Sequence, residues 1–110
     1  MATPEQFAEL DLRVGTVLAA EPFLEARKPS LKLTIDFGPG LGLRRSSAQL
    51  TERYSPESLV GRQVIAAVNL GERRIAGFKS EVLVLGAMPS PTDVVLLQVD
   101  QPVENGTRIG

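Results

Sequence analysis

The sequence predicts one all-β domain, a small barrel of five short strands. Short runs rich in valine, leucine and isoleucine recur along the chain, and 10 glycines and 8 prolines are spread between them. Such runs bounded by turn residues are typical of buried strands. Gly15 lies inside the first run, and a strand glycine often marks a bulge or a sharp bend, as at a barrel corner. With a short helix between strands three and four, this pattern favours the five-stranded Greek-key barrel called the OB-fold.

A helix is predicted at the N-terminus, ahead of the barrel. Thr3 is a capping residue, Pro4 suits the first helical position, and Gln6 completes a capping box. Phe7 and Leu10 are three residues apart and share one face of this helix. A helix this short is not stable alone, so the two side chains are expected to dock on another surface.

The barrel strands follow in order. Residues 12–20 form the first strand, and residues 21–30 form a loop with two prolines. Residues 31–37 alternate between apolar and polar side chains, which is the pattern of a half-buried strand. Residues 38–40 turn the chain, and a third strand begins over residues 43–46.

A second helix is expected between strands three and four. Ser46 or Ser47 caps it, Gln49 lies within its first turn, and it runs to about Tyr54. The remaining elements are expected in this order: strands over residues 63–69 and 81–85, a turn segment over 87–92, a strand over 94–99, and a tight turn at Asn105-Gly106.

The segment 71–80 lies between two buried strands and is expected to be a loop that binds a ligand. Arg73, Arg74 and Lys79 make it basic, and Phe78 is an aromatic side chain that looks exposed. Polar loops on a rigid support are common binding sites. In an OB-fold this loop, the first loop and strands two and three form one ligand face. That face gathers eight basic residues: Arg27, Lys28, Lys32, Arg44, Arg45, Arg73, Arg74 and Lys79.

Charge is distributed unevenly along the chain. Residues 41–80 hold seven arginines and lysines against three glutamates, whereas both ends are acidic and the net charge is −1. A mildly basic centre suits an anionic or peptide-like partner. It is weaker than the strongly basic surface expected of a tight nucleic-acid binder.

Composition excludes several kinds of catalytic site. The chain has no cysteine and no histidine, which rules out Cys/His zinc sites, disulfides and Ser-His-Asp catalysis. Ser80 beside Lys79 is not a catalytic pair, because adjacent strand residues point to opposite faces. We expect no enzyme activity, no cofactor and no metal. No apolar run reaches the roughly 20 residues that span a bilayer, and no export signal is visible, so a cytoplasmic protein is expected.

Three runs in the second half of the chain are apolar at both odd and even positions, so at both strand parities: residues 64–68, 82–85 and 94–97. In a small barrel one parity faces the core, and the other faces outward and needs cover. The N-terminal helix covers part of this surface in our interpretation, and a second copy of the chain covers the rest. A twofold homodimer is the simplest closed arrangement.

Several segments resemble the stand-alone tRNA-binding-domain family, whose domain also ends some methionyl-tRNA synthetases. These segments are residues 11–17 (DLRVGTV), 32–38 (KLTIDFG) and 69–77 (NLGERRIAG). Others are similar to the CsaA branch of that family, the bacterial and archaeal secretion chaperones: residues 46–49 (SSAQ), 73–86 (RRIAGFKSEVLVLG) and 93–98 (DVVLLQ). The resemblance covers about residues 7–110. It implies an OB-fold homodimer that binds preproteins or unfolded polypeptide.

The predicted polypeptide- or tRNA-binding residues are Arg44, Ser46, Ser47, Gln49, Asn69, Arg73, Arg74, Phe78, Lys79 and Ser80. By the same resemblance, copies are joined through extensions at residues 1–10 and 101–110 of a single domain. The predicted dimer contacts are Phe7, Leu10, Pro102, Val103 and Ile109.

Alternatives remain open for several of these residues. Arg73 and Lys79 either hold a carboxylate, phosphate or carbonyl oxygen or are solvated charges, and Arg74 points either way. Phe78 either contacts the ligand or caps the barrel as core. Asn69 either binds the ligand or holds the chain locally, and the local role is favoured. One of the two serines caps the helix, and the resemblance suggests that the other lines the pocket with Gln49.

The leading hypothesis is therefore an ATP-independent chaperone for exported proteins. The alternative is a protein that recognises the folded shape of tRNA, for which salt dependence is steep because neutralised phosphates release counterions. A pI near 5.4 counts against the alternative. The chain also departs from its relatives, which often have prolines where Gly71-Glu72 and Glu104 stand here. The first departure makes the basic loop more flexible and places a negative charge beside Arg73.

Overall fold

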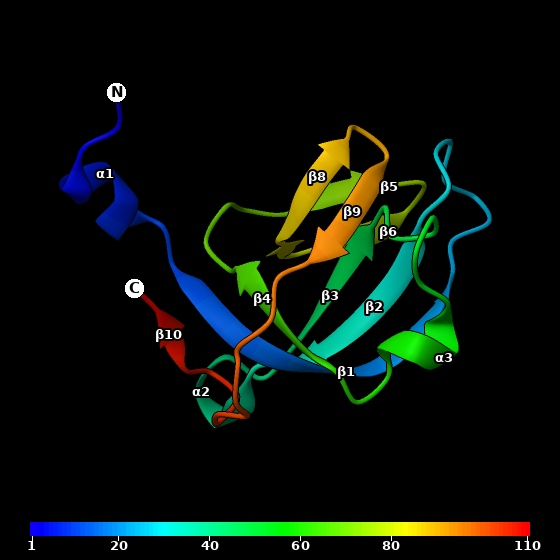
Figure 1. The fold of residues 1–110 in the computed structure, drawn as a ribbon. Coiled ribbons are helices and arrows are strands. Elements are labelled where there is room, and N and C mark those ends of the chain that lie inside the picture. The colour runs from blue at the N-terminus through cyan, green and yellow to red at the C-terminus, as the bar shows by residue number, and fades with distance from the viewer.

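The chain folds into a small antiparallel barrel with two hairpins and three short helices around it (Figure 1). The computed structural model describes residues 1–110. In chain order the elements are α1 (Pro4–Glu9), β1 (Leu12–Pro22), β2 (Leu31–Asp36), α2 (Gly38–Leu41), β3 (Leu43–Ala48), α3 (Pro56–Leu59), β4 (Gln63–Ala67), β5 (Arg73–Ile75), β6 (Phe78–Ser80), β7 (Leu83–Val84), β8 (Gly86–Ser90), β9 (Asp93–Leu96) and β10 (Arg108–Ile109).

The main sheet has the strand order β3-β2-β1-β4-β7, and β10 adds to β1. At its two ends the sheet curls round until the segment after β6 meets β3. There the backbone N–H of Glu81 donates to the carbonyl of Arg45 at 2.8 Å. The barrel of five strands is thereby nearly closed, which confirms the predicted all-β OB-fold.

The barrel interior is filled by the inward side chains of β1, β2 and β4. Along β2 buried and half-buried residues alternate, as the sequence predicts, and Ile35 and Phe37 are fully enclosed. Gly15 in β1 faces these two side chains. A Cβ atom there would lie 2.6 Å from Cγ2 of Ile35 and 2.8 Å from the Phe37 ring. Gly15 therefore allows close packing, while the register shift of β1 lies farther along, between Val17 and Ala19.

A second apolar cluster lies on the outer side of the barrel wall. In register, Leu12 faces Ala67 and Val14 faces Ile65 across β1 and β4. This parity is opposite to that of Val64, which points into the interior. We call the following seven residues the outer cluster: Leu12, Val14, Ile65, Ala67, Leu85, Val99 and Ile109. Apolar side chains at both parities, as expected from the sequence, thus supply two separate clusters.

The helix between strands three and four is present, but the predicted position is wrong. Ser46 and Ser47 belong to β3, which continues to Ala48 because it pairs with β2 throughout its length. The helix is instead α3, where Ser55 and Ser58 form a reciprocal capping box and a proline occupies the first turn.

Two segments expected to be irregular are hairpins. Within residues 71–80, β5 pairs with β6 around Ala76 and Gly77, whose φ angles of 46° and 82° suit a tight two-residue turn. Within residues 87–92 only the end is a turn, because β8 pairs with β9 as far as Ser90. Pro89 is compatible with this strand because β8 is an edge strand.

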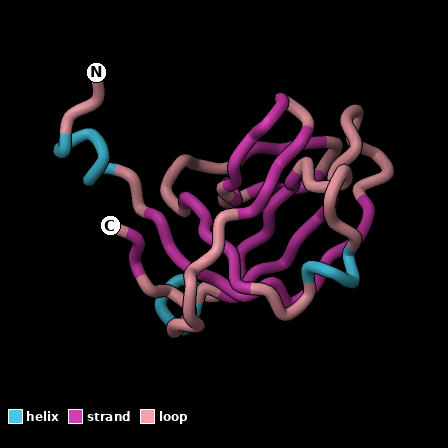
Figure 2. Tube along the Cα trace, viewed as in Figure 1, coloured by secondary structure: helices cyan, strands magenta, loops and turns pink.

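The N-terminal arm, residues 1–10, projects from the barrel on the same side as the C-terminus (Figures 1 and 2). The predicted capping box of α1 is confirmed, with Thr3 and Gln6 bonded to each other's backbone N–H. No residue of α1 is buried, and Phe7 is 50% exposed. Phe7 and Leu10 therefore do not dock on their own chain, because the helix projects away from the barrel (Figure 1), and their docking on another surface stays a prediction. None of the helices has the length and apolar character that crossing a membrane requires.

Candidate functional site

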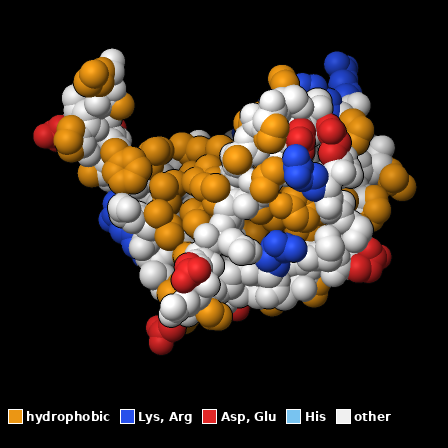
Figure 3. All heavy atoms as spheres, viewed as in Figure 1, with side chains coloured by type: hydrophobic (Ala, Val, Ile, Leu, Met, Phe, Trp, Pro, Cys, Tyr) orange, Lys and Arg blue, Asp and Glu red, His pale blue; other side chains and the backbone are white.

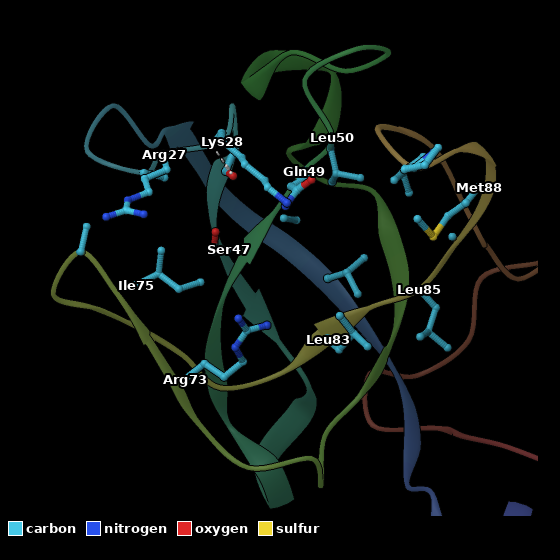
Figure 4. Close-up of a pocket in the computed structure, with 18 of the residues that line it drawn as sticks. Arg27, Lys28, Ser47, Gln49, Leu50, Arg73, Ile75, Leu83, Leu85 and Met88 are labelled. Atoms are coloured by element: carbon cyan, nitrogen blue, oxygen red, sulfur yellow. Dashed lines mark hydrogen bonds between the residues drawn. The ribbon is translucent and has the colours of Figure 1, made fainter.

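A groove of about 860 Å³ runs between the two hairpins. Five segments line it: the loop before β2, the end of β3, β5, β7 and the β8–β9 hairpin. Figure 4 shows their side chains converging on one open space. The volume lies within the range of about 300–1,000 Å³ that is usual for ligand pockets.

The floor of the groove is apolar. Leu50 is buried beneath it, whereas Leu83 and Met88 are 52% and 62% exposed. Aliphatic and methionine side chains left in water at a concave surface favour binding of an apolar partner, and methionine adapts readily to partners of different shape.

The rim of the groove is basic. We define the rim as three basic residues, Arg27, Lys28 and Arg73, and one acidic residue, Glu25. None of the structure's three ion pairs includes a rim residue, so its cations are free to bind carboxylate or carbonyl oxygens. In Figure 4 Arg73 points into the same space as Ser47 and Leu83.

The β5–β6 hairpin separates the predicted basic residues into two groups. Arg73 and Ile75 point to one face, towards the groove, and share this face with Phe78. Arg74 and Lys79 are opposite each other and point to the other face, because neighbouring strand residues alternate. Lys79 there pairs with Glu72, with 3.1 Å between Nζ and Oε1.

Phe78 is buried rather than exposed, with 6% of its surface accessible. It packs edge-on against Phe23, with ring centroids 5.3 Å apart, on the outer surface of β2 and β3. Lys32 Nζ lies 4.7 Å from the Phe23 centroid, and Arg45 Cζ lies 4.4 Å from that of Phe78. We call these four residues the aromatic–cation face. Here Phe78 takes the core role, because it holds the hairpin against the barrel.

The serines near the end of β3 have different environments. Ser46 is buried and its Oγ donates to the carbonyl of Val82 at 3.0 Å, so it neither caps a helix nor lines the groove. Ser47 lines the groove together with Gln49, and its backbone N–H donates to Ser80 Oγ at 3.0 Å. Ser47 and Gln49 therefore face the groove, whereas Ser46 and Ser80 brace the strands around it.

The last two predicted site residues lie away from the groove. Arg44 has the inward parity of Ser46, and its Nε donates to the carbonyl of Leu41 at 3.1 Å. Asn69 accepts from the Asp11 N–H at 2.9 Å and donates to the Glu9 carbonyl at 2.7 Å, so it holds the N-terminal arm. Among the ten predicted residues, the structure brings Ser47, Gln49 and Arg73 into the groove.

The β8–β9 hairpin, one wall of the groove, is attached to the loop after β3 by polar contacts. Arg53 makes two hydrogen bonds to Asp93, one of them 2.8 Å long between Nη2 and Oδ2. The hydrogen bond from Arg53 lowers the pKa of Asp93. The hydroxyl of Tyr54 accepts from the backbone N–H of Leu96 at 3.0 Å. No three acidic side chains anywhere lie close enough to hold a metal ion.

Leu83, Met88 and Leu50 are groove residues that the sequence reasoning did not assign to the site. The apolar run around Leu83 predicts that some of its side chains face outward. It does not predict that Leu83, Met88 and Leu50 meet beneath Arg73. Arg27 and Lys28 were placed on the basic face, and both are in the rim.

The comparisons with known proteins agree with this architecture. The family described as "Putative tRNA binding domain" matches residues 12–108. The crystal structure of the chaperone CsaA from Bacillus anthracis str. Ames is 57% identical, with a TM-score of 0.95 over 100% of this chain and 99% of that one. The CsaA chaperone protein from Picrophilus torridus is 42% identical, with a TM-score of 0.92 over the whole of both chains. The chain therefore belongs to the tRNA-binding-domain family, and within that family it is of the CsaA type.

Methionine–tRNA ligases contain a similar segment. The enzyme of Methanothrix thermoacetophila is 42% identical over 105 residues, which are 96% of this chain and 15% of the ligase. The chain spans only 14% to 16% of the length of such relatives. The similarity to the ligases is thus limited to one domain of those enzymes.

Proposed function

We propose that the groove binds extended segments of unfolded polypeptide and that the protein is a cytoplasmic chaperone whose clients include preproteins bound for export. The observation that carries this proposal is an apolar floor beneath three cations that have no ion-pair partner. Unfolded chains offer both aliphatic side chains and oxygen acceptors. Two of the similar structures are of proteins named chaperones.

Binding of this kind is weak and reversible. A client leucine buried against Leu83 and Met88 contributes about 1.5–3 kcal/mol, and ordering the client offsets much of this gain. Micromolar affinity corresponds to roughly 8 kcal/mol and permits fast dissociation. Release therefore needs no nucleotide in this mechanism.

We propose further that the protein acts as a homodimer joined through residues 1–10 and 101–110. The projecting arm leaves Phe7 and Leu10 exposed, and Val103 is exposed in the C-terminal segment. Figure 3 shows a broad apolar area between the arm and the β8–β9 hairpin, and the outer cluster lies in this part of the barrel wall. A second copy placed there covers the apolar area and gives both arms a surface to dock on. Pro102 and Ile109 belong to the same proposed contact.

The second candidate function is recognition of tRNA, and the aromatic–cation face favours it. Lys32 and Arg45 have no acidic partner and lie over aromatic rings beside the open groove. Cations at a surface contact the phosphates of a nucleic acid, and the buried rings of Phe23 and Phe78 hold these two cations in place. Arg74 and Lys79 add charge on the outer face of the hairpin, although Glu72 neutralises Lys79.

Titration of the purified protein with a labelled unfolded preprotein and with labelled tRNA, each at 50 mM and 200 mM salt, tests the two functions. The chaperone proposal expects preprotein binding that weakens much less with salt than tRNA binding does, because the apolar floor contributes to it together with the rim cations. The tRNA alternative expects submicromolar binding that falls at least tenfold over this range, because neutralised phosphates release counterions. Exchange of Lys32 and Arg45 for alanine abolishes tRNA binding only, whereas Leu83→Asp abolishes preprotein binding only. Submicromolar tRNA binding without preprotein binding overturns the proposal.

A further inference from the structure

The outer edge of β5 has no strand beside it. β5 pairs with β6 alone, in a two-stranded sheet separate from the barrel. In an antiparallel hairpin, residue pairs that exchange two backbone hydrogen bonds alternate with pairs that exchange none. Ile75 and Phe78 flank the two-residue turn and exchange both hydrogen bonds, whereas the next pair, Arg74 and Lys79, exchanges none. The N–H and C=O groups of Arg74 consequently point away from β6. They form an open donor and acceptor at the outer edge of the hairpin.

This edge borders the groove. The face of β5 that carries Arg73 and Ile75 is the face that lines it. A third strand added beside β5 continues the same pleated sheet, so every second side chain of that strand points to the side of Arg73 and Ile75. These side chains therefore enter the groove, towards the apolar floor, and the intervening ones stay in water.

The opposite wall of the groove does not offer an equivalent edge. β8 pairs only with β9, but it contains Pro89, which has no N–H to donate. Its pairing with β9 is also irregular, with a register shift between Ala87 and Ser90. Proline and irregular pairing are both features that prevent strand addition at a sheet edge. β5 has neither, so it is more open to strand addition than β8.

We propose that the client binds by adding a strand to β5, with its backbone paired to Arg74 and alternate side chains lying in the groove. This inference rests on the proposed chaperone function and specifies how the client is held. The occupant is an extended polypeptide segment whose inward side chains are aliphatic or acidic. Its charge is set by the rim, where Arg27, Lys28 and Arg73 outnumber the single acid Glu25. A third strand also suits the hairpin itself, because isolated two-stranded sheets are marginally stable.

Strand addition accounts for recognition of many different sequences. Backbone hydrogen bonds are the same for every non-proline residue, and the groove selects only for apolar or acidic character at alternate positions. Proline at a position whose N–H faces β5 prevents binding, whereas proline one residue away leaves that hydrogen bond intact.

The test uses the whole protein and a fluorescein-labelled ten-residue peptide in which every second residue is leucine or aspartate and the residues between them are serine. Arg74→Pro removes the outward N–H of β5 but none of the hairpin's own hydrogen bonds, and Arg74→Ala is the matched control. Fluorescence anisotropy is expected to show about tenfold weaker binding for Arg74→Pro and less than a twofold change for Arg74→Ala. Circular dichroism verifies that both variants are folded.

A series of peptides, each with one N-methylated residue, makes the test independent of the variants. Strand addition predicts a position-dependent series, with binding lost where the methylated N–H is the one that pairs with the carbonyl of Arg74 and kept at the residues on either side of it. A flat series, with the parent peptide still bound and still weakened by Arg73→Glu, overturns strand addition but leaves the groove as the site. Failure of the unmodified protein to bind the parent peptide overturns the proposed function and this inference with it.

Discussion

Arg73 and Arg74 are neighbours in β5, but only Arg73 faces the groove. Arg73→Glu and Arg74→Glu alter the net charge of the protein by the same amount and on the same strand. Any general electrostatic effect on an acidic client is therefore equal in the two variants. The difference between them reports whether the client lies at the groove.

The size of the expected effect follows from the rim. The rim of the native protein has three cations and one acid, whereas the rim of the Arg73→Glu variant has two cations and two acids. One charge contact at an exposed site contributes about 1 kcal/mol. The exchange removes an attraction and adds a repulsion of similar size, so an acidic peptide is expected to bind about 30-fold more weakly. The side chain of Arg74 is on the other face, so its charge acts on the peptide only through screening solvent. For Arg74→Glu we therefore expect the affinity for the peptide to fall only two- to threefold.

Anisotropy titrations of the leucine–aspartate peptide at 50 mM and 500 mM salt measure both effects. The gap between the two variants should narrow at the higher salt, because screening shortens the reach of the rim charges. Equal losses for both variants, or a larger loss for Arg74→Glu, would contradict the placement of the client in the groove.

Three further changes test other parts of the structure. Gly15→Ala places a methyl group against the core and should lower the free energy of unfolding by about 1–3 kcal/mol in urea titrations; unchanged stability would show that the barrel relaxes freely there. Because Arg53 lowers the pKa of Asp93, their contact stabilises the hairpin above the ordinary carboxylate pKa of about 3.9 and is lost as pH falls through the lowered pKa. Hydrogen exchange in β8–β9 should rise over that acidic range in the native protein, whereas Asp93→Asn should show the fast exchange at every pH. Phe7→Ser with Leu10→Ser should convert dimers to monomers in sedimentation velocity without changing peptide affinity per chain; persistence of dimers would exclude the arm from the contact.

Local patterns in the sequence predict most of the fold. The alternation along β2 and the capping box of α1 depend on residues a few positions apart, so the sequence contains all that determines them. The same reasoning misplaces the helix after β3, because Ser46 and Ser55 are both acceptable caps. Pairing of β3 with β2 decides between them, and that contact joins residues distant in the chain.

The candidate site depends on orientation, which is harder to predict. Arg73 and Arg74 look equivalent in the sequence, and only the turn at Ala76 sets which one faces the groove. Leu83 lies in a run that is apolar at both parities, so its exposure depends on which strand covers which side. Phe78 is buried because Phe23, from a different loop, packs against it.

Methyl NMR of the protein with a bound client tests the location of the site most directly. The chain has four isoleucines, of which Ile75 lines the groove, Ile35 is in the core, and Ile65 and Ile109 belong to the outer cluster. With isoleucine and methionine methyl groups labelled, the leucine–aspartate peptide should shift the resonances of Ile75 and Met88 and leave those of Ile65 and Ile109 in place. Saturation with peptide that moves the outer-cluster signals while Ile75 and Met88 stay unchanged would contradict the groove as the binding site.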